Sequence, residues 1–191
     1  MVELILTVFI VYIAPFPIWL ILLHILAKKE IKFPLLLWFY LSIGIVWLIG
    51  LYLAFTLQDV LFSSRFKTNI FLQGIGFLFL IIALIIEWQS AKVMGLKRLI
   101  CLTELQQTGS PDKLVTTGIY YYARHPRYIE YPLLPLGFAL IFGYKFLLVF
   151  SFYLFVGYTI ASYFEDAELL NRFGEAYSKY QKEVPRFFIS F

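Results

Sequence analysis

The sequence predicts an all-α integral membrane protein with five transmembrane helices, the last two forming a hairpin, and a C-terminal amphipathic helix on the cytoplasmic side. Hydrophobic residues make up 61% of the 191-residue chain and charged residues only 15%, which is unlike an ordinary soluble domain. Apolar runs of bilayer length recur along the chain, and Lys and Arg cluster beside their ends. A net charge of +4 distributed in this way indicates membrane topology and argues against a nucleic-acid partner.

Five apolar runs define the expected spans within one membrane domain, residues 1–191. Residues 1–86 hold the first three, at 4–26, 33–57 and 69–86, each close to the roughly 20 residues that a helix needs to cross a bilayer. Pro15 and Pro17 are expected to kink the first. Residues 129–164 form the hairpin, with arms at 129–142 and 146–164. The first arm is short, roughly 21 Å at the helical rise, so a re-entrant segment is the alternative to a span.

The distribution of basic residues predicts the orientation of the chain. Thirteen of the 16 Lys and Arg lie in the first loop, in the loop after the third span, or in the C-terminal tail. By the positive-inside rule, the N-terminus is outside, and the third loop and the C-terminus are cytoplasmic. Two segments that are far apart in the sequence, the third loop and the tail, should therefore lie at the same face of the membrane.

The tail is expected to contain one amphipathic helix over residues 165–183, within a cytoplasmic segment 165–191. Its apolar positions recur at the three- and four-residue spacing of a single helical stripe. They are Leu169, Leu170, Phe173, Tyr177, Tyr180 and Val184. Such a helix lies on the membrane interface or docks on the third loop.

Polar chemistry concentrates in residues 87–128, which we expect to be a cytoplasmic loop. Residues 90–116 are long for a plain connector, which indicates a functional loop. Residues 117–128 then contain four tyrosines, two arginines and His125 directly before an apolar run. Snorkelling basic residues and interfacial tyrosines could simply anchor a membrane protein. However, Glu165 and Asp166 are expected at the same membrane face, and together the two segments predict a pocket for a charged small molecule.

Other motifs carry less information. Gly74 and Gly76 lie in an apolar helix, so they predict close helix packing and not a nucleotide-binding loop. His24 is expected to be a span-end residue without a role, and Cys101 a small residue near the membrane. With two histidines and one cysteine, the sequence predicts no metal site.

Residues 114–120, 124–128 and 165–186 together resemble the C-terminal half of the isoprenylcysteine carboxyl methyltransferases, which belong to a wider group with membrane phospholipid methyltransferases. The resemblance covers residues 87–188 and implies a pocket for S-adenosylmethionine. The catalytic residues that it implies are Arg124, His125, Tyr128 and Glu165. The cofactor-binding residues that it implies are Asp112, Lys113, Leu114, Val115, Tyr120, His125, Pro126, Arg127, Tyr128 and Glu165, with Gln106 or Gln107 as a further contact.

The residue types suit this cofactor, which carries a sulfonium, an ammonium and a carboxylate. Arg124, His125 and Arg127 can receive the carboxylate. Glu165 can accept from the ammonium or the ribose hydroxyls, and tyrosine rings can stack on adenine or face the sulfonium.

Two positions depart from the family pattern and concern the methyl acceptor. Glu130 stands where the family usually has a small residue, and Ala161 stands near the position of the family's substrate-binding arginine. We hypothesise that Glu130 faces the acceptor and favours a neutral or amine-bearing lipid. The alternative is that Glu130 pairs with Arg124 or Arg127.

The resemblance thus predicts an integral-membrane methyltransferase that transfers a methyl group to a lipid or lipidated acceptor, such as an isoprenylcysteine carboxylate. One alternative is a phospholipid amine methyltransferase. Another is a sterol-type membrane reductase using NADPH, since those enzymes have a similar Arg-His-x-x-Tyr segment. A non-enzymatic membrane component that binds a ligand in the same pocket is a further possibility.

Overall fold

Lipid offers the backbone no hydrogen-bond partners. A long apolar segment in lipid therefore favours a helix, because a helix satisfies its own backbone donors and acceptors. The computed structural model describes residues 1–27, 33–99 and 113–188, and in these ranges the chain is helical, without a β-strand. The expectation of an all-α fold is therefore confirmed.

The first apolar run forms two helices, α1 (Val2–Ile13) and α2 (Phe16–Ala27). The break falls at Ala14 and Pro15, where the proline ring removes a backbone donor. The second run forms α3 (Phe33–Thr56), and the short helix α4 (Gln58–Ser63) follows it.

The third run is longer than predicted. Helix α5 (Ile70–Leu99) continues beyond residue 86, so the expectation that a loop begins at residue 87 is wrong over residues 87–99. The extension carries Glu87, Lys92 and other polar residues, which end the hydrophobic run but do not stop a helix. Residues 113–117 lead into the 3₁₀ turn η1 (Gly118–Tyr121), and the predicted contacts Asp112, Gln106 and Gln107 lie outside the described residues.

The predicted hairpin is present as α7 (Arg127–Phe142) and α8 (Lys145–Phe173). Gly143 makes the turn at φ +79°, a left-handed conformation that suits glycine. A Cβ at this position would also lie 2.4 Å from the carbonyl oxygen of Phe66, so the turn is closed against the connection between α4 and α5.

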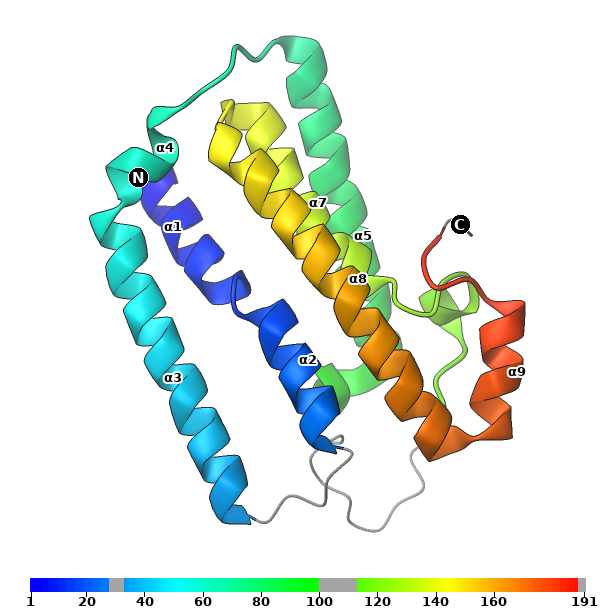
Figure 1. The fold of residues 1–191 in the computed structure, drawn as a ribbon. Coiled ribbons are helices and arrows are strands. Elements are labelled where there is room, and N and C mark those ends of the chain that lie inside the picture. The colour runs from blue at the N-terminus through cyan, green and yellow to red at the C-terminus, as the bar shows by residue number, and fades with distance from the viewer. Residues whose placement is uncertain (28–32, 100–112, 189–191) are drawn as a thin grey trace.

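The single tail helix predicted over residues 165–183 is wrong. Residues 165–173 belong to α8, and Gly174 interrupts the helix at φ +55° before α9 (Glu175–Glu183) begins. A left-handed glycine changes the direction of the chain, so α9 turns back toward η1 (Figure 1).

The long helices lie side by side in an order that differs from the order in sequence (Figure 1). Helix α3 packs on α1, α2 packs on α8, α8 on α7, and α7 on α5. The hairpin therefore separates α1 and α2 from α5, and the segment between η1 and α7 comes close to the C-terminal part of α8.

Three stretches are long and apolar enough to cross a membrane, namely Val2–Ile25, Ile70–Met94 and Lys145–Phe173. A fourth, Leu41–Thr56, is apolar but shorter. Many large apolar side chains on these helices are exposed, including Ile5, Tyr52, Phe71 and Val149. In water such a surface would be a liability, and it is expected where lipid replaces water as the solvent.

The α5–α7 contact is closest at Gly76 and Gly137. A Cβ on Gly76 would lie 2.7 Å from the carbonyl oxygen of Gly137, and a Cβ on Gly137 would lie 2.8 Å from that of Gly76. Neighbouring Gly74 has nothing within 4 Å of the equivalent position. The prediction that these glycines serve helix packing is therefore correct for Gly76 and wrong for Gly74.

We expect the Gly76→Ala substitution to lower the free energy of unfolding by about 1–3 kcal/mol, because the added methyl group forces two backbones apart. The matched control is Gly74→Ala, where the better helix propensity of alanine should leave stability unchanged or raise it by up to about 1 kcal/mol. Thermal unfolding of both variants in the same detergent measures the difference. Equal thermal unfolding midpoints for the two variants would contradict the close contact of α5 with α7 at Gly76.

Candidate active site

The segment 122–126 is held against the C-terminal tail by its backbone. The amide of Arg124 donates to the carbonyl of Pro185 at 2.9 Å, and the amide of His125 donates to that of Arg186 at 2.9 Å. These two bonds bring the arginine–histidine motif to the C-terminal part of α8, where the acidic pair lies. The predicted proximity of the two segments is confirmed.

Both ring nitrogens of His125 contact carboxylates. Nδ1 lies 3.1 Å from Glu165 Oε2 and Nε2 lies 2.7 Å from Asp166 Oδ1, with the ring almost fully buried. Burial opposes the charged imidazole, but Glu165 and Asp166 outweigh it and raise the pKa of His125 above its ordinary value. Since carboxylates accept, both nitrogens donate as in an imidazolium. His125 therefore positions the two acids and has no nitrogen left for a ligand.

Asp166 is the centre of a buried charge network. Besides His125, it accepts from Arg124 Nη1 at 2.8 Å, from Arg186 Nη2 at 2.9 Å, and from the Tyr177 hydroxyl. Its side chain is only 6% exposed, so these four donors replace water around the carboxylate. The network links segment 122–126 to α8, α9 and the tail. It occupies Arg124, which was expected from the sequence to receive a cofactor carboxylate.

Aromatic rings continue from the histidine into the bundle. Tyr128 stacks on His125 with ring centroids 5.4 Å apart and lies 5.1 Å from Tyr158, and Tyr131 stacks on Tyr158 at 4.6 Å. The three tyrosines come from α7 and α8 and form an aromatic wall beside the acidic pair.

Arg127 joins this wall to α5. Its Nε lies 3.2 Å from Glu87 Oε2, and its Nη2 donates to the Tyr131 hydroxyl at 2.7 Å. Glu130 lies on the same side, near Glu87, and is 5% exposed. The alternative in which Glu130 forms an ion pair with Arg124 is wrong, because Arg124 is bound to Asp166.

These side chains enclose a cavity of about 460 Å³ that also reaches the first span. Predicted site residues that line it are Tyr120, Arg124, His125, Pro126, Arg127, Tyr128, Glu130 and Glu165. Within the described ranges, no group of His, Cys, Asp or Glu is placed to hold a metal ion.

Four predicted residues lie elsewhere. Leu114 packs on the cluster of Tyr177, Tyr180 and Val184, and Val115 packs on Ile86, Ile119 and Tyr120. Neither they nor Lys113 line the cavity. Ala161, near the position of the family's substrate-binding arginine, is fully buried among the helices and does not line it either.

Several residues of the site were not predicted from the sequence. Glu87 and Tyr131 were not among the predicted site residues, and His24 was expected to have no role. Glu87, His24 and Tyr131 all line the cavity. Tyr131 lies four residues after Arg127 on α7, so helical periodicity was a usable signal for it. Glu87 lies on α5 and His24 on α2, and no local sequence pattern places either of them beside the motif.

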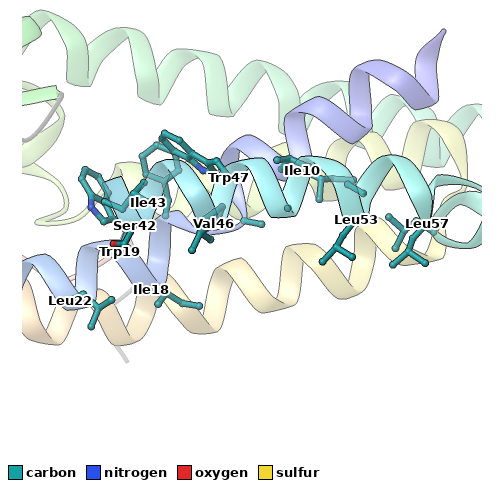
Figure 2. Close-up of a pocket in the computed structure, with 17 residues that line it drawn as sticks. Ile10, Ile18, Trp19, Leu22, Ser42, Ile43, Val46, Trp47, Leu53 and Leu57 are labelled. Carbon is teal, nitrogen blue, oxygen red and sulfur yellow. The ribbon is translucent and has the colours of Figure 1, made fainter. Parts of the chain in front are cut away.

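A second, apolar cavity of about 500 Å³ lies between α1, α2 and α3. Figure 2 shows side chains such as Ile18, Val46 and Leu53 around it, from the first two apolar runs. Phe16, Trp19 and Trp47 line both cavities. A polar chamber at the motif is thus adjacent to an apolar one within the membrane-spanning part of the bundle.

Comparison with known proteins decides the family. The phospholipid methyltransferase family matches residues 72–176, more than half of the chain and the whole region from α5 to the start of α9. The chain belongs to this family.

A curated relative is Protein-S-isoprenylcysteine O-methyltransferase of Schizosaccharomyces pombe, which is 38% identical over 73 residues. The match covers 38% of this chain and 31% of the relative, so the chain matches less than a third of the relative's length. No solved structure shows significant similarity to the chain. The family membership supports the predicted methyltransferase resemblance and disfavours the sterol-type reductase.

Proposed function

We propose that this protein is an S-adenosylmethionine-dependent membrane methyltransferase whose acceptor is a lipid or a lipidated molecule such as an isoprenylcysteine carboxylate. The observation that carries the proposal is the cavity that joins the His125–Glu165 pair to the aromatic wall, inside the region that matches the methyltransferase family.

The residues present suit S-adenosylmethionine. A volume of about 460 Å³ is typical of small-molecule sites. Glu165 is held by His125 but keeps 21% of its side chain exposed, so its carboxylate can accept from the cofactor's ammonium or ribose. The faces of Tyr128 and Tyr131 suit a sulfonium or adenine. Arg127 uses Nε and Nη2 for protein contacts, and within the described part of the chain this leaves Nη1 for a carboxylate.

The cofactor would supply a methyl carbon that is already activated by a sulfonium, so the protein needs no strong base or metal for that step. Its own residues would align the two reactants and exclude water. Tyr158, His125 and Asp166 form the dry support behind Glu165, since all three side chains are buried. In this interpretation, Arg124 and His125 act by positioning Glu165, and Glu165 and Tyr128 contact the cofactor.

The apolar cavity supports a lipid or lipidated acceptor. Its lining side chains are almost all hydrophobic and surround a space of about 500 Å³ next to the polar chamber. Relative to the same chain in water, a hydrocarbon chain placed there would gain roughly 0.8 kcal/mol for each buried CH₂ group. The reacting head group would then extend past Trp19 and Trp47 toward Glu165.

We also propose the membrane arrangement that the sequence predicts. Five spans would comprise α1 with α2, α3, α5, α7 and α8, and α9 would lie at the interface as an amphipathic helix. The N-terminus would be outside and the C-terminus cytoplasmic. Support comes from the three long apolar helices and from the contact of the motif with the tail at one end of the bundle.

A phospholipid amine is the second candidate acceptor. Glu130 Oε2 is buried without a hydrogen-bond partner among the described residues, and Ala161 supplies no cation for a carboxylate. A carboxylate-lined chamber favours an ammonium over another anion.

Two measurements on purified protein in nanodiscs test the proposal. Calorimetry should detect S-adenosylmethionine binding, and labelled methyl transfer should follow when S-farnesylcysteine or phosphatidylethanolamine is supplied, but not with S-methylcysteine, which lacks the chain. A folded sample that binds no S-adenosylmethionine refutes the proposal, and equal transfer to S-methylcysteine refutes the lipid acceptor.

A further inference from the structure

His24 lies on α2, outside residues 72–176 that match the family, and yet it lines the polar cavity. Its ring is 2% exposed and packs within the bundle. The first span therefore brings an imidazole to the centre of a site that is otherwise built from the hairpin and the motif.

The tautomer of His24 follows from one contact. Nδ1 lies 2.6 Å from the backbone carbonyl oxygen of Leu20, and a carbonyl oxygen only accepts, so Nδ1 carries a proton. In a neutral ring, Nε2 is then a bare acceptor. Nε2 is buried and has no hydrogen-bond partner among the residues that the structure describes. An unmade hydrogen bond at a buried position is costly, so a partner other than the described residues is expected.

A second polar atom in the same cavity lacks a partner. Glu130 Oε2 is also buried and unbonded within the described ranges, and Glu130 comes from α7, a different helix from that of His24. A ligand that donates hydrogen bonds would satisfy the bare Nε2 of His24. A bare carboxylate would face that nitrogen with oxygen lone pairs and would leave it unsatisfied.

We propose that His24 contacts the methyl acceptor, and that its Nε2 accepts a hydrogen bond from an N–H or O–H of the acceptor's head group. This inference rests on the proposed methyltransferase function. The acceptor, and not S-adenosylmethionine, is the partner of His24 because the family-matched region already supplies the residues suited to the cofactor, whereas α2 also lines the apolar cavity through Trp19 and Leu22. His24 thus selects amine- or hydroxyl-bearing head groups.

The test compares probes that differ only in a hydrogen-bond donor. Dodecylamine and dodecyltrimethylammonium carry the same charge and chain, but only the first has N–H groups. Dodecanol and dodecyl methyl ether make the same comparison for O–H. Binding to the full-length protein in nanodiscs is measured without S-adenosylmethionine. Each probe's affinity is corrected for its partition into protein-free nanodiscs before the two affinities within a pair are compared.

In the wild-type protein, we expect the donor-bearing member of at least one pair to bind about tenfold or more tightly. His24→Phe should bring that ratio close to one, and His24→Gln should restore most of it because the glutamine amide oxygen can occupy the place of Nε2. The pair that responds identifies the head group as an amine or a hydroxyl. If His24→Phe does not fold, His24→Asn replaces it in the test. Asparagine places a polar group only near the position of Nδ1, so this variant also lacks an acceptor at the position of Nε2.

An affinity ratio that is unchanged in His24→Phe or His24→Asn overturns the inference, as does a wild-type preference for the members without donors. Binding of S-adenosylmethionine to the same samples separates the two proposals. Cofactor binding that is equal in wild type and variants, without a His24-dependent probe preference, refutes only the role of His24. A His24-dependent preference without cofactor binding refutes the methyltransferase function.

Discussion

Replacing Asp166 with alanine is expected to lower the free energy of unfolding by about 3–5 kcal/mol, the largest loss that we predict for one substitution. Arg124 and His125 would remain buried without the carboxylate that lies 2.8 and 2.7 Å from them, and Arg186 would lose its partner at 2.9 Å. An unpaired buried cation costs far more than a lost surface contact. Because these residues connect four elements, we also expect S-adenosylmethionine binding to disappear.

The matched control is the Glu183→Gln variant, which removes the exposed ion pair between Lys179 and Glu183 on α9. The charged atoms of this pair are 4.0 Å apart and its side chains are 77% and 62% exposed, so Glu183→Gln should change stability by less than about 0.5 kcal/mol. Unfolding of both variants in the same detergent, followed by tryptophan fluorescence, provides the comparison. A loss in Asp166→Ala no larger than in Glu183→Gln would show that the buried network contributes little to the fold.

Helix existence could be predicted from the sequence because apolar length and flanking charge are local properties. The apolar runs at 4–26 and 69–86 correspond to α1 with α2 and to α5. The predicted hairpin arms, 129–142 and 146–164, leave the turn at the residues where Gly143 makes it. Helix ends were predicted less well. Polarity ended the predicted third span at residue 86, but backbone hydrogen bonding continues to Leu99, since leaving the membrane does not require a helix to stop.

The tail shows the opposite error, because a continuous apolar stripe concealed a break. Leu169, Phe173 and Tyr177 have helical spacing on both sides of Gly174, so periodicity predicted one helix. The glycine at φ +55° ends α8 and redirects α9 toward the motif. Glycine near the end of a helix was a usable signal for this C-terminus.

The proximity of the two segments that form the site could be predicted from the sequence, but the individual contacts between their side chains could not. The resemblance placed His125 and Glu165 together, and they lie 3.1 Å apart. It did not reveal that Asp166 would bind Arg124 and His125. From the sequence alone, two adjacent acidic residues on a helix cannot be assigned to different partners. The resemblance also missed His24, whose position depends on how α2 packs against α8, a long-range contact without local sequence information.

The Glu165→Gln substitution is expected to weaken S-adenosylmethionine binding by about 10- to 100-fold and to reduce methyl transfer at least as much. Glutamine keeps the shape of the side chain and an oxygen that can accept from His125 Nδ1, now 3.1 Å from Glu165. It removes the negative charge that we propose for the cofactor's ammonium. The fold should therefore persist, and calorimetry with the cofactor should show the loss directly.

Glu168→Gln is the matched control, since Glu168 lies three residues along α8, pairs with Arg172 at 3.5 Å and does not line the cavity. Cofactor affinity in this variant should stay near the wild-type value. Equal affinities in Glu165→Gln and Glu168→Gln would place the cofactor away from the His125–Glu165 pair. A selective loss in Glu165→Gln, with unchanged thermal stability, would instead separate the two acids by role, because Glu165 would then serve the ligand while Asp166 serves the fold.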